Sequence, residues 1–170
     1  MDPVLATGQQ RLIVCTEYAG VVPAALVGFK DRGVRRLGGE LGNVLAAGLI
    51  AATDRGSHGG HVVPAASSPA AVRRRGFDHM AQLARHAAAV AGLPWRQLLV
   101  AGRRADQTGL DSAARRRNVS GRMRSRPPGS GGVIVVDDIR ASGATLAECD
   151  RALQAGGYTV LAHVVIAAVI

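Results

Sequence analysis

The apolar residues of this chain recur with two alternating periods. A first helix is expected over 21–29. Helical spacing appears over 34–53 and again from Met80 to Ala91, where Gly92 and Pro94 end the pattern. Another helical stripe runs from Leu146 to Leu153 and is ended by Gly156. Short apolar or β-branched runs, typical of strands, lie at 11–15, 61–64, 97–101, 133–136 and 159–166. Strands that alternate with helices indicate parallel βαβ units. The pattern therefore predicts an α/β fold with a mostly parallel central sheet and helices on both of its faces.

The run Val133–Val136 is the clearest predicted strand, because four consecutive apolar residues suit a strand that is covered on both faces. Two carboxylates, Asp137 and Asp138, follow it directly. A loop of small residues comes next, and a helix is expected to begin at about Ala144. Ligands of open α/β sheets bind at the carboxyl ends of strands, and a helix that opens from a small-residue loop offers N–H groups to a phosphate. We therefore expect a phosphate site beside a pair of acids that can hold hydroxyl groups or hydrated magnesium.

The length of 170 residues suits a single domain that spans the chain. Residues 1–10 are expected to form a loose arm. The stretch 103–131 is polar, rich in Arg and punctuated by Gly and Pro, so it is expected to be a mobile loop region. The two cysteines, Cys15 and Cys149, lie far apart and form no Cys-x-x-Cys pair. No zinc module is therefore expected, and Cys149 is expected to lie in the core.

The formal charge of +9 favours a polyanionic partner, either a phosphorylated small molecule or nucleic acid. Lys30 is the only lysine among 21 Lys and Arg residues. The chain has one Trp, two Tyr and two Phe, which leaves little aromatic surface on which single-stranded nucleic acid could stack. Neither a signal peptide nor an apolar run of membrane-spanning length is visible, so we expect a cytoplasmic protein without membrane contact.

The segment Asp137–Thr145 resembles the 5-phosphoribosyl-1-pyrophosphate (PRPP) motif of type I phosphoribosyltransferases. In that motif an apolar strand is followed by two acids, an apolar residue, a variable residue and a small-Thr/Ser-Gly-x-Thr loop. Three further segments are similar to one branch of the superfamily, the ComF family of competence protein F-like phosphoribosyltransferases: Tyr18–Gly33, Arg75–Ala84 and Gln107–Val119. The resemblance covers roughly residues 15 to 165 and implies the type I phosphoribosyltransferase fold.

This resemblance implies a role for each matched position. Asp137 and Asp138 would hold the ribose hydroxyls and carry the catalytic role, while the turn with Ala65 and Ala66 would bind pyrophosphate, assisted by Arg75. The 5-phosphate would be held by the loop residues Ala141, Ser142, Gly143, Ala144 and Thr145. Magnesium would arrive mainly with the pyrophosphate of PRPP, and no residue is assigned as its ligand. The implied reaction transfers the phosphoribosyl group to a nitrogen acceptor that the sequence does not identify.

The chain departs from the family at several positions. The N-terminal four-cysteine zinc module of many members is absent, and the Val-Pro-Val-Pro turn reads Val63–Ala66. Ala141 stands where some relatives carry a carboxylate near the base, so this loop supplies no general base. The altered turn favours an alternative: a non-catalytic protein on the same fold that binds PRPP or phosphate or associates with nucleic acid, related to DNA uptake. The intact acid pair favours the enzyme.

Two further questions stay open. The basic stretch 103–126 is interpreted as a hood over PRPP, and a nucleic-acid-binding arm is the less favoured alternative. The block from Gln107 to Asn118 favours the hood, because binding of a phosphate backbone alone does not need those residue types. A homodimer is compatible with the sequence.

Overall fold

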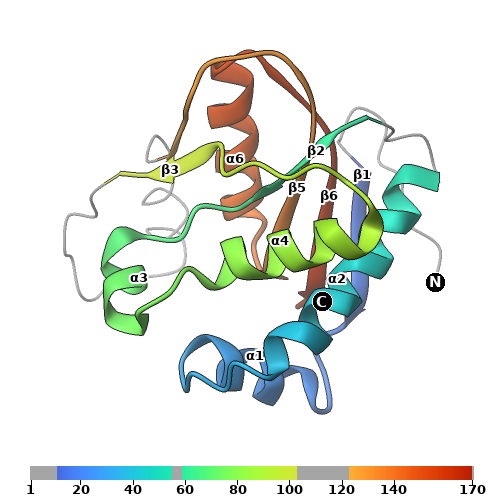
Figure 1. The fold of residues 1–170 in the computed structure, drawn as a ribbon, viewed down its shortest axis with the longest axis vertical. Coiled ribbons are helices and arrows are strands. Elements are labelled where there is room, and N and C mark those ends of the chain that lie inside the picture. Colours follow the sequence, from blue (N-terminus) through green and yellow to red (C-terminus); the bar gives the residue numbers. More distant parts are fainter. Residues whose placement is uncertain (1–10, 55–58, 103–122, 170) are drawn as a thin grey trace.

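The computed structural model describes residues 11–54, 59–102 and 123–169 (Figure 1). Its helices are α1 (Val22–Lys30), α2 (Leu37–Asp54), α3 (Pro69–Arg75), α4 (His79–Ala91) and α6 (Ala144–Ala155). Its strands are β1 (Arg11–Glu17), β2 (His61–Pro64), β3 (Leu99–Ala101), β4 (Met123–Ser125), β5 (Gly131–Arg140) and β6 (Tyr158–Ala168). None of these helices is both long and apolar enough to cross a bilayer.

The main sheet has the order β1-β6-β5-β2, and all of its neighbouring strands are parallel. The predicted strand Val133–Val136 is the middle of β5, which pairs with β6 on one edge and with β2 on the other. All four of these residues are buried, with at most 1% of their surface exposed. The expectation of a central strand in a parallel sheet is confirmed, and β3 and β4 form a separate antiparallel pair.

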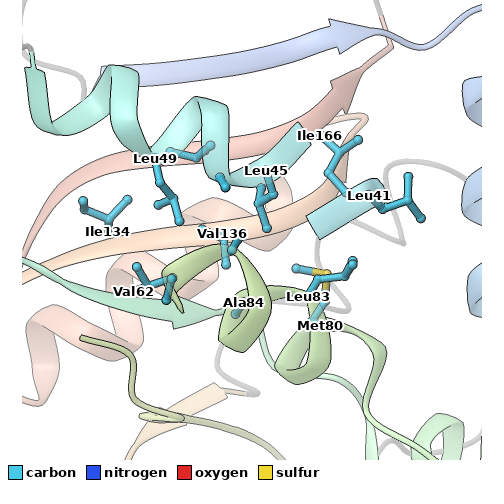
Figure 2. Close-up of a cluster of buried hydrophobic side chains, with 14 of the residues drawn as sticks. Leu41, Leu45, Leu49, Val62, Met80, Leu83, Ala84, Ile134, Val136 and Ile166 are labelled. Atoms are coloured by element: carbon cyan, nitrogen blue, oxygen red, sulfur yellow. The ribbon is translucent and has the colours of Figure 1, made fainter. Parts of the chain in front are cut away.

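Each face of the sheet has its own apolar core, because successive residues of a strand point to opposite faces. Ile134 and Val136 of β5 pack beneath α2 and α4, in a cluster with Leu45, Leu49 and Leu83 (Figure 2). On the opposite face lie Val133 and Val135, which pack with the α6 residues Leu146, Cys149 and Leu153. The two cores confirm the prediction that helices cover both faces of the sheet, and Cys149 lies in the core as expected.

The chain leaves β2 and β5 in opposite directions. After β2 it passes through α4 to a segment in which Trp95 forms a parallel bridge with Val62. After β5 it passes through α6 to β6, on the other side of β5. The gap between the carboxyl ends of β2 and β5 is therefore a topological switch point, the place where open α/β sheets bind ligands.

Two elements lie where the sequence predicted none. Helix α3 follows β2, and none of its residues is buried, so it lacks the apolar stripe on which a helix prediction depends. Strand β4 lies inside the stretch 103–131 that was assigned no regular structure, and its three residues are too few to show a period. Residues 103–122, which make up most of the predicted hood 103–126, lie outside the described residues, as does the arm 1–10. The last part of the hood stretch is described, and its residues Met123–Ser125 form β4.

Close packing of α2 on the sheet gives a stability prediction. A Cβ atom at Gly48 would lie 2.5 Å from Val164 Cγ1 and 2.6 Å from Cys15 Sγ. We expect Gly48→Ala to lower the free energy of unfolding by about 1–3 kcal/mol, because the helix must move away from the sheet. Gly39→Ala is the matched control, since a Cβ there meets nothing within 4 Å. It should stabilise α2 by about 0.5–1 kcal/mol through helix propensity. Urea unfolding of both variants measures the difference, and equal effects would contradict this packing.

Candidate active site

A cleft of about 1030 Å³ opens at the switch point between β2 and β5. Its floor is formed by the carboxyl end of β5, and its walls come from the turn after β2, from α3, and from the ends of α1 and α4. Among the residues that line it are Lys30, Ala65, Ala66, Arg73, Arg74, Arg75, His79, Asp137, Asp138, Ala141 and Thr145. The cleft thus places most of the site residues predicted from the sequence around one space.

The two acids at the floor point to different sides of β5. Asp137 and Asp138 expose only 7% and 6% of their surface, respectively. Because side chains alternate along a strand, Asp137 follows Val133 and Val135 toward the α6 face, and Asp138 follows Ile134 and Val136 toward the α4 face. Asp137 Oδ1 accepts a hydrogen bond from the backbone N–H of Asp138 at 2.9 Å. The pair is therefore asymmetric, and each acid meets different neighbours.

Asp138 accepts hydrogen bonds from three donors. Its Oδ1 accepts from the backbone N–H of Ile139 at 2.9 Å. Its Oδ2 lies 2.7 Å from Lys30 Nζ and 3.3 Å from His79 Nε2. Lys30 is the last residue of α1, and His79 is the first residue of α4. One carboxylate therefore ties two helices to the end of the central strand.

Arg75 closes this network into a ring. Its Nη1 lies 3.2 Å from His79 Nδ1, and its Nε lies 3.4 Å from Asp31 Oδ1. Because a guanidinium only donates, Nδ1 of His79 must accept, which leaves the ring proton on Nε2, facing Asp138. Asp31 directly follows Lys30, so the connection runs from α1 through α3 and α4 to β5 and back. Arg75 thus lies at the wall of the cleft, where the sequence predicted a ligand contact, and its buried Nε has an ion pair with Asp31 but no hydrogen-bond partner among the described residues.

The pKa values of the two acids are driven apart. Burial, followed by repulsion from the charge of Asp138, raises the pKa of Asp137 to about 8. Burial also acts to raise the pKa of Asp138, but the hydrogen bond from His79 and the charge of Lys30 outweigh it and hold that pKa well below the usual range. Near neutral pH the floor of the cleft therefore carries one protonated and one ionised carboxyl group.

The loop between β5 and α6 has the backbone shape expected of a phosphate cradle. Gly143 takes a φ of +76° at the N-cap of α6, a conformation that residues with a Cβ rarely adopt. Ala141 and Thr145 line the cleft, whereas Ser142 and Gly143 form the turn beside it and Ala144 begins α6. Ser142 Oγ lies 3.4 Å from the Ala144 N–H, so this hydroxyl already contacts one of the amides expected to meet phosphate.

The turn after β2 forms the opposite wall. Ala65 is buried and donates its N–H to the carbonyl of Val136 at 2.9 Å, which fixes the turn to β5. Ser67 Oγ donates to Asp78 Oδ1 at 2.8 Å, and Ser68 Oγ caps α3 by accepting from the Ala71 N–H. The two serines therefore hold α3 and the start of α4 in place, while Ala65 and Ala66 face the cleft.

Three site residues were not found from the sequence. Lys30 and His79 contact Asp138, although Lys30 is 108 positions away from it in the chain. Arg140 was treated as a variable position, yet a Cβ atom at Gly143 would lie 3.6 Å from its Nε, so its guanidinium is beside the loop. The sequence offered a signal for two of them: Lys30 is the only lysine of the chain and lies in the segment Tyr18–Gly33 that resembles the ComF family, and His79 lies in the similar segment Arg75–Ala84.

The described residues contain no group of three or more His, Cys, Asp and Glu side chains that could hold a metal ion. Asp138 already accepts from Lys30, His79 and Ile139, so its oxygens are engaged by the protein.

The cradle at Gly143 gives a binding prediction. Gly143→Ala should strain the loop by about 1–2 kcal/mol and disturb the amides of the α6 N-terminus, so PRPP affinity should fall about tenfold or more. Gly92→Ala is the matched control, because Gly92 also has a positive φ, +67°, but lies at the end of α4. It should cost similar stability and leave PRPP affinity unchanged. Calorimetric titration and thermal unfolding measure both effects, and equal PRPP affinity in the two variants would refute the cradle.

A scan against protein-family models and a search of curated proteins each give no match. Solved structures similar to the chain include an orotate phosphoribosyltransferase from Aeropyrum pernix, with 17% identity over 82% of this chain and 62% of that chain, at a TM-score of 0.47. Another is the hypoxanthine phosphoribosyltransferase of Trypanosoma cruzi, with 18% identity, 78% and 73% coverage and a TM-score of 0.46.

A third similar structure is the glutamine phosphoribosylpyrophosphate amidotransferase from B. subtilis complexed with ADP and GMP, with 23% identity and a TM-score of 0.45. The match covers 75% of this chain but only 25% of the amidotransferase chain. The chain thus spans about a quarter of the amidotransferase and about three fifths of the orotate enzyme.

Proposed function

We propose that this protein is a phosphoribosyltransferase of the ComF type that binds PRPP and transfers its 5-phosphoribosyl group to a nitrogen acceptor, with release of pyrophosphate. One observation carries the proposal: the acid pair of β5, the loop that opens α6 and the turn after β2 meet around one cleft at the switch point of a parallel sheet. The sequence resemblance implies that these three segments bind the ribose, the 5-phosphate and the pyrophosphate, in that order.

Phosphoribosyl transfer needs few catalytic groups once the two reactants are held in position. Displacement of pyrophosphate at the anomeric carbon develops positive charge on the ribose ring, and an ionised carboxylate nearby stabilises that charge. Asp138 is the ionised acid of the pair. The leaving pyrophosphate is anionic, and the wall next to it carries Arg73, Arg74 and Arg75 on α3. Magnesium bound to pyrophosphate would neutralise further charge in the same place. We place the reaction in the cytoplasm.

Isothermal titration calorimetry with PRPP, with and without magnesium, tests the binding step. Saturable one-to-one binding that strengthens with magnesium is expected. Pyrophosphate release in the presence of purines, pyrimidines and simple amines then tests transfer and identifies the acceptor. A folded protein that does not bind PRPP would overturn the proposal.

The second candidate is a non-catalytic protein that binds PRPP or phosphate on the same fold. It is favoured by Asp138, whose oxygens already accept from Lys30, His79 and a backbone amide, so a ligand hydroxyl must compete with protein donors there. This candidate predicts PRPP binding without pyrophosphate release for every acceptor tested. Its association with nucleic acid would appear as DNA binding that weakens steeply with salt.

A further inference from the structure

We propose that Lys30 is a ligand-binding residue of this cleft that donates a hydrogen bond to a ribose hydroxyl, with Asp138 acting as the anchor that holds its ammonium group in place. This inference rests on the proposed function and adds to it a contact from α1, to which the acid-pair and loop motif Asp137–Thr145 does not extend.

The contacts of Asp138 indicate that it holds Lys30 rather than a ligand. Asp138 is occupied by the protein, since Lys30 and His79 donate to Oδ2 and the Ile139 amide donates to Oδ1. A carboxylate that already accepts three hydrogen bonds has little capacity left for a ligand. Its evident effect is to hold the ammonium of Lys30, 2.7 Å away, at the floor of the cleft.

Lys30 retains donors for a ligand. An ammonium group has three N–H donors, and within the described part of the chain Asp138 is the acceptor that it meets. Its side chain lines the cleft and is 29% exposed, so the remaining N–H groups face the space that a ligand would fill. Asp138 is held from the other side by His79, which in turn contacts Arg75, and Arg75 pairs with Asp31 beside Lys30.

The charges of Lys30 and Asp138 indicate which group of PRPP binds beside them. The ammonium of Lys30 is already neutralised by Asp138, so the pair offers no net positive charge to attract a phosphate group. A hydroxyl group carries no charge and can accept from the ammonium. The cations of α3 remain available for phosphate, because Arg73 and Arg74 line the opposite wall. Lys30 is therefore assigned to the ribose rather than to pyrophosphate.

The unique lysine makes a direct test possible. Wild-type protein is treated with an acetylating reagent in the presence of magnesium, and modification of Lys30 is followed by mass spectrometry of its peptide. The N-terminal α-amino group serves as the internal reference. PRPP should slow acetylation of Lys30 at least about fivefold relative to that reference, whereas inorganic pyrophosphate and inorganic phosphate should leave it unchanged. Protection by pyrophosphate alone would overturn the assignment to the ribose.

Variants test the same point by affinity. Lys30→Met should weaken PRPP binding about tenfold to a hundredfold and leave pyrophosphate binding within about twofold of wild type. Arg32→Met removes an exposed cation two residues away and is the control for charge alone; it should bind PRPP like wild type. Circular dichroism checks that both variants fold.

The outcomes separate this inference from the proposed function. If wild-type protein fails to bind PRPP, both are wrong. If wild-type protein binds PRPP while Lys30 is acetylated at an unchanged rate, or while Lys30→Met binds equally well, only the role of Lys30 is wrong. If the Met variant does not fold, the acetylation experiment on wild-type protein still decides.

Discussion

Replacing both Asp137 and Asp138 by Asn should reduce turnover at least about a thousandfold, because the variant loses the charge that stabilises a developing ribose cation. The side-chain shapes are nearly preserved, and both positions lie at the end of a strand that is otherwise held by apolar packing. The α/β secondary structure should therefore remain. Steady-state pyrophosphate release from PRPP measures the loss once an acceptor is known.

The same double variant distinguishes an enzyme from a binding protein. In an enzyme, the loss in turnover should exceed the loss in PRPP affinity, since charge stabilisation is stronger in the transition state than in the ground state. In a binding protein, only affinity should change. Turnover within about tenfold of wild type would refute the catalytic role of this acid pair.

Single substitutions of the two acids should change stability in opposite directions, and this is the second large effect that we expect. Asp138→Asn should destabilise the protein by about 2 kcal/mol or more near neutral pH, because the half-buried ammonium of Lys30 and the buried ring of His79 lose their charged acceptor. Asp137→Asn should stabilise the protein by more than about 1 kcal/mol at pH 9, because it removes a carboxyl group whose ionisation is opposed by burial.

The pH windows of these effects follow from the direction of each pKa shift. The pKa of Asp137 is about 8 in the folded protein, whereas an unfolded carboxyl titrates near pH 4. Between these values the folded state keeps a proton that the unfolded state releases, so stability falls as pH rises. The benefit of Asp137→Asn should therefore grow from about pH 4 to about pH 8 and vanish below that range.

Asp138 behaves in the opposite way, because its folded pKa lies below that of an unfolded carboxyl. Its stabilising contribution is present above about pH 4 and is lost as pH falls through the folded value. Urea unfolding of both variants across pH 3–9 checks the two curves. Curves of the same sign for the two variants would contradict the asymmetric environment of the pair.

The predictions for Asp137 and Asp138 depend on one feature of the fold. Asp137 and Asp138 are neighbours in sequence, yet they face opposite sides of β5 and meet different partners. Removing Lys30 or His79 would take away one of the two side-chain partners of buried Asp138, so we expect α1 and α4 to act together with β5 as one site.

The sequence by itself determined the order and type of most elements. The apolar run Val133–Val136 predicted the central strand, and the glycines Gly92 and Gly156 predicted where α4 and α6 end, as the structure shows. The loop before α6 was likewise readable, because a glycine there permits the positive φ that the turn requires. These features are local, since they depend on the period and the conformational preferences of a few adjacent residues.

Only the tertiary structure decided which side chains meet. Lys30 and Asp138 are 108 positions apart, and His79 and Asp138 are 59 apart. The hydrophobic period of α1 and α4 predicts which face of each helix is buried, but it does not predict which polar residue will stand at the end of the facing strand. Helix α3 was not predicted for a related reason: it buries no residue and is held by the cap at Ser68 and by the contacts of Arg75. The acid pair was thus visible in the sequence, whereas the partners that make its two members different depend on how the helices pack around the end of β5.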